Sequence, residues 1–179
     1  ETPRLLLRPW ADADRAPFAA LNADPVSMQH FPATLTRDES DALIDRMIAR
    51  RAETGLCFQA VERRSDAAFI GMVGLNPVAF DAPFTPATEI GWRILRAHEG
   101  QGYVTEAARA WLDHGFGALG LPRIVAFTVP ANTRSRAVMQ RLGMTHVADG
   151  DFDHPNLAPG HTLRRHVLYV LDAPARASP

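Results

Sequence analysis

The stretch AHEGQGYVTEAARAWL, residues 97–112, constrains the fold more than any other part of the chain. Gly100 and Gly102 stand directly before a run whose apolar residues recur at helical spacing. The first turn of a helix leaves backbone N–H groups unpaired and carries about half a positive charge, so it attracts an anion where no side chain blocks the approach. A strand-like run, TEIGWRIL (88–95), precedes the glycines. The order strand, glycine loop and helix therefore predicts a cradle for a phosphate or pyrophosphate.

Two glycines alone are a weak motif, because a tight turn from strand to helix needs them as well. The third glycine of the dinucleotide fingerprint is missing, since Glu106 and Ala107 stand where the helix would approach its strand. All 19 basic residues are arginine, which excludes a phosphate-loop lysine and a lysine Schiff base. An enzyme that uses the same loop for ATP stays open as an alternative.

Length and composition predict one domain over residues 1–179, with 173–179 as a frayed tail, because 46% hydrophobic residues in 179 suffice for a core. A net charge of -1 gives no long-range attraction to nucleic acid or to an anionic membrane, so neither is an expected partner. The lone Cys57 cannot form an internal disulfide and reads as a small core residue. Without a signal-like or membrane-spanning segment, we expect a cytoplasmic protein.

Strand and helix signals alternate along the chain. A helix should begin at Thr36, whose spacing to Glu39 is a capping-box pattern, and end at Gly55. Its apolar stripe consists of Leu43, Ile44, Met47 and Ile48. One further helix should follow Asp12, one should contain the apolar residues from Val104 to Leu112 and end at Gly117 or Gly120, and one should span 133–142. The expected strands are 4–10, 56–63, 68–75, 88–95, 123–129, 145–148 and 164–171. Strands 56–63 and 68–75 should form an antiparallel hairpin.

A second polar segment, NTRSRAVMQRLGM (132–144), follows the strand at 123–129. Asn132 ends this strand and Ser135 lies in the first turn of the next helix, so both should face the crevice beside the glycine loop. Either residue can also be a simple helix cap.

The segments EIGWRILRAHEGQGYVTEAARAWLDHGF and NTRSRAVMQRLGM together resemble the acetyl-CoA-binding motifs of the Gcn5-related N-acetyltransferase (GNAT) superfamily. RLLLRPW and GYVTEA are more similar to its ribosomal-protein N-acetyltransferase (RimJ/RimL-like) branch. The resemblance extends from about Arg4 to Leu171 and is strongest over 88–144. It implies an α/β (α+β), GNAT-type three-layer fold with helices on both faces of a mixed, strongly bent sheet of about seven strands. This sheet should splay between strands 88–95 and 123–129.

The resemblance also implies how acetyl-CoA, the acetyl donor, is held. The main chain near Ile94 would contact the pantetheine arm and thioester, and Asn132 would bond the same arm or a water beside it. The pyrophosphate would be bound by backbone N–H groups of the glycine loop, Gly100, Gln101, Gly102, Tyr103, Val104 and Thr105. Glu99 and Val104 depart from the family pattern, and Glu99 is expected to point outward because its charge would repel phosphate.

Acyl transfer from the thioester needs a deprotonated amine, a polarised carbonyl and a stabilised thiolate. Glu89, beside the expected gap, is the leading general base, although the same position suits a solvated or arginine-paired carboxylate. Met139 stands where the family often has a tyrosine acid. Ser135 is the substitute, either as a weak acid or as a hydrogen-bond donor to the thiolate.

Three histidines, His154, His161 and His166, can place an imidazole near the acceptor amine. Their spacing matches no standard zinc pattern, so no metal is expected. His30, in a loop between early helices, can border the acceptor or be ordinary loop surface. Trp92, on the central strand, can touch the acceptor or be a core residue. Arg134, Arg136 and Arg141 can reach the adenosine phosphate or form a solvated helix face.

Two classes of function remain for the chain. One is an acetyl-CoA-dependent transferase that acts on a primary amine, either a protein N-terminus or a small molecule, in a ternary complex. The other is a non-catalytic acyl-CoA-binding or sensing module. The apolar stretch AFDAPFTP (79–86) suggests a surface on which a second copy can form a homodimer.

Overall fold

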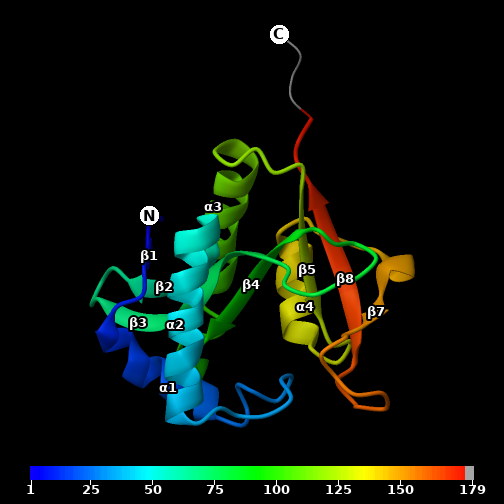
Figure 1. Ribbon diagram of the computed structural model, residues 1–179. Helices are drawn as coiled ribbons and strands as arrows, with labels where there is room; N and C mark the ends of the chain where they lie inside the picture. Colours follow the sequence, from blue (N-terminus) through cyan, green and yellow to red (C-terminus); the bar gives the residue numbers. More distant parts are fainter. Residues whose placement is uncertain (176–179) are drawn as a thin grey trace.

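A computed structural model describes residues 1–175 (Figure 1). Its strands form one eight-stranded sheet in the order β1-β2-β3-β4-β5-β8-β6, with β7 paired to β8 beside this path. The strands are β1 (Leu5–Arg8), β2 (Cys57–Arg63), β3 (Ala68–Pro77), β4 (Thr88–Ile94), β5 (Arg123–Thr128), β6 (Thr145–His146), β7 (Phe152–Asp153) and β8 (Arg165–Asp172). The helices of at least nine residues are α1 (Arg15–Ala23), α2 (Arg37–Thr54), α3 (Tyr103–Gly117) and α4 (Thr133–Arg141). Apart from the short β7, which was not expected, every one of these elements overlaps one predicted from the sequence.

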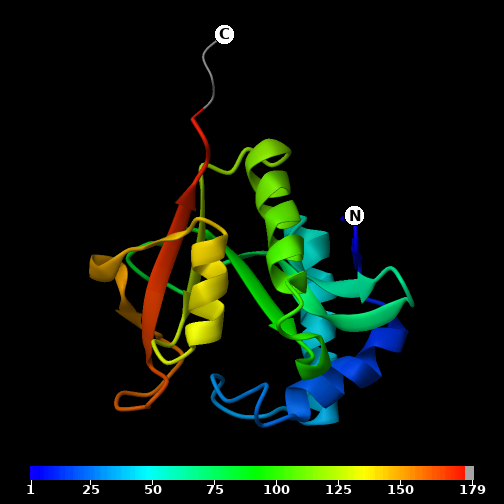
Figure 2. The ribbon, with the colours of Figure 1, turned by 180° about the vertical axis from the view of Figure 1, so that it is seen from behind.

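The helices cover both faces of the sheet, so the predicted three-layer α/β architecture is confirmed (Figures 1 and 2). Helices α1 and α2 pack on one face through a core that includes Phe18, Ile44 and Met47. Helices α3 and α4 pack on the other face through a larger core that includes Trp111 and Met139. Cys57 is buried in the first core, as expected.

The sheet splays at its centre, between β4 and β5. These two strands run parallel and share a single ladder position, Glu89 opposite Val125, whereas the other strand pairs of the described chain are antiparallel. Beyond this position the strands diverge, which Figure 2 shows from behind. After Glu89, β4 has no further ladder pair on that side among residues 1–175, as the resemblance implied.

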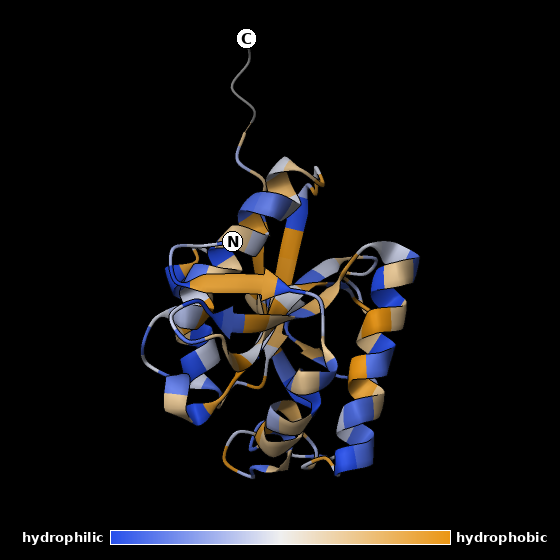
Figure 3. Ribbon diagram, turned by 90° about the vertical axis from the view of Figure 1, so that its left-hand side faces the viewer, coloured by the Kyte–Doolittle hydropathy of each residue, from blue (hydrophilic) through white to orange (hydrophobic). Residues whose placement is uncertain are grey.

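Helix α2 starts where the capping-box pattern placed it. The Glu39 N–H donates to the Thr36 hydroxyl at 3.3 Å, and the Thr36 N–H donates to the Glu39 carboxylate at 2.8 Å. Gly55 ends the helix in the left-handed conformation, with φ of 77°. The apolar stripe was predicted one residue too wide, because Ile48 is 45% exposed while Ile44 is buried. In Figure 3 the sheet strands are mostly hydrophobic, whereas hydrophilic and hydrophobic residues alternate along α2.

Removal of this cap should weaken the fold by a modest, measurable amount. Thr36→Ala is expected to lower the free energy of unfolding by about 1 kcal/mol, because the first-turn N–H group of Glu39 loses its acceptor. Urea unfolding followed by circular dichroism measures this change. Arg46→Ala, an exposed substitution in the middle of the same helix, should change stability by less than about 0.5 kcal/mol. Equal losses in both variants would show that Thr36 does not act as a cap.

Two expectations about the chain surface need correction. Ala173 is not frayed, because its N–H donates to the Pro122 carbonyl at 2.9 Å; residues 176–179 of the expected tail lie outside the described residues. Phe80 and Phe84, in the stretch 79–86, pack against Phe127 and Phe152 of the same chain and do not form an exposed patch. None of the helices described here is both long and apolar enough to cross a membrane.

Candidate active site

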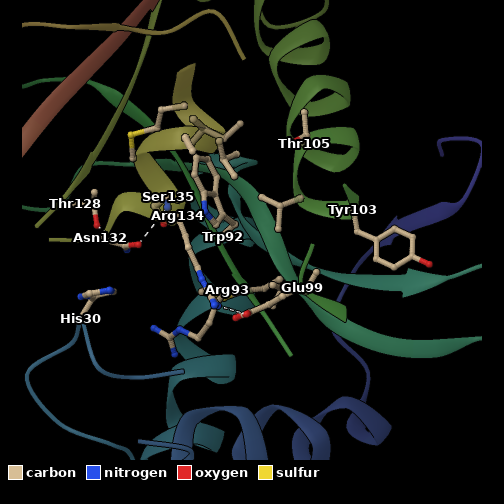
Figure 4. Close-up of a pocket in the computed structure, with 18 of the residues that line it drawn as sticks. His30, Trp92, Arg93, Glu99, Tyr103, Thr105, Thr128, Asn132, Arg134 and Ser135 are labelled. Atoms are coloured by element: carbon tan, nitrogen blue, oxygen red, sulfur yellow. Dashed lines mark hydrogen bonds and ion pairs between the residues drawn. The ribbon is translucent and has the colours of Figure 1, made fainter. Parts of the chain in front are cut away.

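A cleft of about 1960 Å³ opens where β4 and β5 diverge (Figure 4). Pockets for a single small ligand usually enclose roughly 300–1000 Å³, so this cleft has room for a large cofactor and a second substrate. Its walls come from β4, the glycine loop, α3, α4, the segment between α1 and α2, and the segment before β8. Both motifs found in the sequence therefore meet in one cavity.

The glycine loop presents backbone N–H groups to this cleft. Gly100 and Gly102 have φ of 73° and 79°, a conformation that residues with a Cβ rarely adopt. No N–H group from Gly100 to Thr105 donates to a backbone carbonyl among residues 1–175; the first such bond in α3 runs from Glu106 to the Gly102 carbonyl. A Cβ on Gly100 would meet no atom within 4 Å, so open space lies in front of the loop. Unpaired amides, open space and a helix N-terminus fit a diphosphate.

Side chains also hold the loop in place. The Arg4 guanidinium donates to the Gln101 carbonyl at 3.0 Å and pairs with Glu106 at 2.6 Å, and it lies 4.6 Å from the centre of the Tyr103 ring. Gly100, Gly102, Tyr103, Val104 and Thr105 line the cleft, whereas Gln101 does not. Arg4 and Glu106 thus neutralise each other beside the loop and fix its shape.

Glu99 does not point away from the cleft as expected. Its carboxylate forms an ion pair with Arg134 at the start of α4, and both side chains line the cavity (Figure 4). The pair neutralises the charge that would otherwise repel phosphate. Residues 35 positions apart in sequence form this contact, which spacing within the loop does not reveal.

Asn132 acts as the cap of α4. Its side-chain oxygen accepts a hydrogen bond from the Ser135 N–H at 3.1 Å, and its amide group donates to the Thr128 hydroxyl at 3.0 Å. Asn132, Thr128 and Ser135 all line the cleft (Figure 4). The capping alternative is thus confirmed, while one amide hydrogen of Asn132 has no acceptor within the described part of the chain. Arg136 instead bonds Tyr169 and the Pro130 carbonyl.

Glu89 lies at the apex of the splay and lines the cleft. Its carboxylate accepts a hydrogen bond from the Asn76 amide at 3.0 Å and forms no ion pair among the described residues. Burial raises the pKa of Glu89 to about 7, although Asn76 and the nearby Arg50 oppose this shift. A carboxyl group with such a pKa can accept a proton near neutral pH.

The remaining predicted substrate residues, His30, Trp92 and His154, also line the cleft. His166 joins them, with its ring centre 5.0 Å from that of His154, but His161 does not. Burial lowers the pKa of His30, His154 and His166, which favours their neutral forms. In the described part of the chain no three His, Cys, Asp or Glu side chains gather as metal ligands would.

Among the charged residues of the cleft that the sequence analysis did not single out is Arg93. It lies two positions beyond Gly91 and four beyond Glu89 on β4, so the three share one face of the strand. This alternation was visible in the sequence, but the lack of a charged partner for Arg93 within residues 1–175 was not.

Comparison with known proteins gives a consistent result. The acetyltransferase (GNAT) domain family matches residues 4–145. An uncharacterised N-acetyltransferase of Bacillus subtilis, YnaD, is 30% identical over 145 residues, which are 80% of each chain. The FsC-acetyl coenzyme A-N(2)-transacetylase of Aspergillus fumigatus is 32% identical over 152 residues, 82% of this chain and 64% of that protein. The crystal structure of an acetyltransferase from Agrobacterium tumefaciens superposes with a TM-score of 0.76 at 29% identity and covers 96% of this chain and 92% of its own.

Proposed function

The chain belongs to the acetyltransferase (GNAT) family, and from this premise we propose that it moves the acetyl group of acetyl-CoA to a primary amine by direct attack on the thioester in a ternary complex. Binding of acetyl-CoA is typical of the family. The acceptor, either a protein N-terminus or a small molecule, and the roles of individual residues are parts of the proposal.

The observation that carries the proposal is the row of backbone N–H groups from Gly100 to Thr105, which have no backbone acceptor among residues 1–175 and lie at a cleft that continues along β4. The diphosphate would bind these amides. The arm that ends in the thioester would follow the unpaired edge of β4 past Ile94, where the parallel ladder has ended. Asn132 faces the same gap with its free amide hydrogen.

In the proposed reaction the amine nitrogen forms a bond to the carbonyl carbon and the carbon–sulfur bond breaks. Glu89, directly or through water, accepts the proton that the nitrogen must lose. Ser135 donates a hydrogen bond to the thiolate, which leaves with the bonding electron pair. Because both substrates are held in one cleft, their orientation supplies much of the rate, with effective concentrations of ~10⁵ M or more.

Within the family we place the chain in the ribosomal-protein N-acetyltransferase (RimJ/RimL-like) branch. The spellings RLLLRPW at 4–10 and GYVTEA at 102–107 support this placement. Both segments have structural roles here, since Arg4 braces the loop and Glu106 holds Arg4. The placement concerns ancestry, and it leaves the acceptor open.

Release of free CoA thiol tests the proposed function. Incubation with acetyl-CoA and a panel of primary amines should release thiol with at least one amine and produce the acetylated amine in equal amount. If acetyl-CoA binds but no amine gives release, the chain is the alternative, an acyl-CoA-binding module. If ATP binds to the loop and CoA does not, both interpretations are wrong.

A further inference from the structure

Arg93 lies on the face of β4 opposite Trp92 and Ile94. Trp92 and Ile94 pack with the core beneath α3 and α4, whereas Arg93 contacts Asn22 of α1 and Phe31 of the segment between α1 and α2. Arg93 therefore faces the side of the cleft away from α3. With the diphosphate at the N-terminus of α3, that side is left for the acceptor.

The positive charge of Arg93 has no partner within residues 1–175. Its Nη1 donates to the uncharged Asn22 amide oxygen, its Nε is buried without an acceptor, and its guanidinium lies 4.1 Å from the centre of the Phe31 ring. By contrast, Arg4 and Arg134, two other arginines of the cleft, each pair with a carboxylate. Burial lowers the pKa of Arg93 to about 10, which still leaves it charged at neutral pH.

A buried charge without a counter-ion destabilises a fold unless a ligand compensates it. Arg93 is one wall of a cavity that reaches solvent, so an incoming anion can approach it. Guanidinium groups bind carboxylates with strong, charge-assisted hydrogen bonds. A carboxylate group on a substrate can therefore supply the missing counter-ion.

The spacing along β4 relates this charge to the proposed base. Glu89 and Arg93 are four residues apart on one face, which separates their Cα atoms by ~13 Å. The Phe58 ring lies over Gly91 between them, since a Cβ on Gly91 would be 2.8 Å from that ring. The acceptor face thus has a base at one end, an aromatic floor and a cation at the other end.

We propose that Arg93 binds a carboxylate on the acceptor, so that the substrate is an amine that also carries a carboxylate group. Its amine lies at Glu89 and its carboxylate at Arg93, with an apolar part over Phe58. This inference rests on the proposed function for the position of the amine. A polyamine fits poorly, because one of its cationic groups would face Arg93.

Matched amines test the proposal. 4-(Aminomethyl)benzoate and 4-(aminomethyl)benzamide differ only in the charged group, and 5-aminopentanoate with its amide gives a flexible second pair. Wild-type protein should use each carboxylate with a kcat/KM about 10–100-fold above that of its amide. Arg93→Gln should reduce this ratio to within about threefold, mainly through KM for the carboxylate, and Arg93→Lys should keep part of it. Arg96→Gln, an exposed arginine outside the cleft, should leave the ratio unchanged.

A binding measurement separates this inference from the proposed function. 4-Methylbenzoate and 4-methylbenzamide lack the amine, so their affinity in the presence of CoA, measured by NMR titration, does not depend on acyl transfer. Tighter binding of the benzoate to wild type than to Arg93→Gln, without turnover of any amine, would keep the carboxylate site and contradict the transferase. Equal kcat/KM for the carboxylate and amide amines, or equal affinity for the two methyl compounds, would overturn the role of Arg93.

Discussion

Replacement of Glu89 with glutamine is expected to lower kcat about 10²–10⁴-fold while the dissociation constant for CoA stays within about twofold. The substitution keeps the size of the side chain and its contact with Asn76, but removes the proton acceptor at the apex of the splay. Steady-state thiol release gives kcat, and calorimetric titration with CoA gives the affinity. Glu62→Gln, a β2 carboxylate outside the cleft, is the matched control and should retain turnover.

The pH dependence provides an independent check on Glu89. Because its pKa is about 7, the wild-type rate should rise as pH increases from 6 to 8, and Glu89→Gln should lack this rise. The folded-state pKa is above the ordinary value of 4.5, so Glu89 favours the folded state at low pH and this contribution is lost as pH rises through 7. Glu89→Gln should therefore gain thermal stability relative to wild type at pH 8 but not at pH 4. Undiminished turnover in this variant would remove the base assignment.

Ser135 is expected to contribute less than Glu89. Its backbone is fixed by Asn132, so Ser135→Ala removes a hydroxyl group without disturbing the cap. The expected loss is about tenfold or less in kcat, the size of one hydrogen bond to the leaving thiolate.

The sequence predicted those parts of the molecule that local chemistry determines. Gly100 and Gly102 adopt left-handed conformations that few other residues tolerate, so the loop was visible from residue types alone. The capping box at Thr36 is equally local. Alternation and apolar runs located the central strands, and the position of Glu89 on β4 followed from them.

Contacts between distant segments were beyond such reasoning. The orientation of Glu99 depends on Arg134 in α4, and the burial of Phe80 depends on Phe127 of β5 and Phe152 of β7. Arg93 shows the same limit, because its proposed role depends on the absence of a carboxylate partner within residues 1–175, which the sequence does not reveal. A single sequence shows which charges exist, but only the packed chain shows which of them are compensated.

Substitution of Gly100 with valine should weaken CoA binding about 100-fold or more. A β-branched side chain at φ of 73° strains the loop by ~1–3 kcal/mol, and its methyl groups would occupy the open space in front of the amides. Loss of two charge-assisted hydrogen bonds to the diphosphate costs ~1.5–3 kcal/mol each, and every 1.4 kcal/mol is about tenfold in affinity. Calorimetric titration with CoA measures the change.

Gly120 provides a control, because it has the same left-handed backbone conformation but lies outside the cleft. It has φ of 62°, a Cβ there would also meet no atom within 4 Å, and it does not line the cleft. Gly120→Val should therefore lose stability to a similar extent as Gly100→Val but retain its affinity for CoA. Comparable losses of CoA affinity in the two variants would mean that backbone strain weakens CoA binding indirectly, by destabilising the fold. Unchanged affinity in Gly100→Val would mean that the loop amides do not hold the diphosphate, and the acyl-transfer assignment of the cleft would lose its principal support.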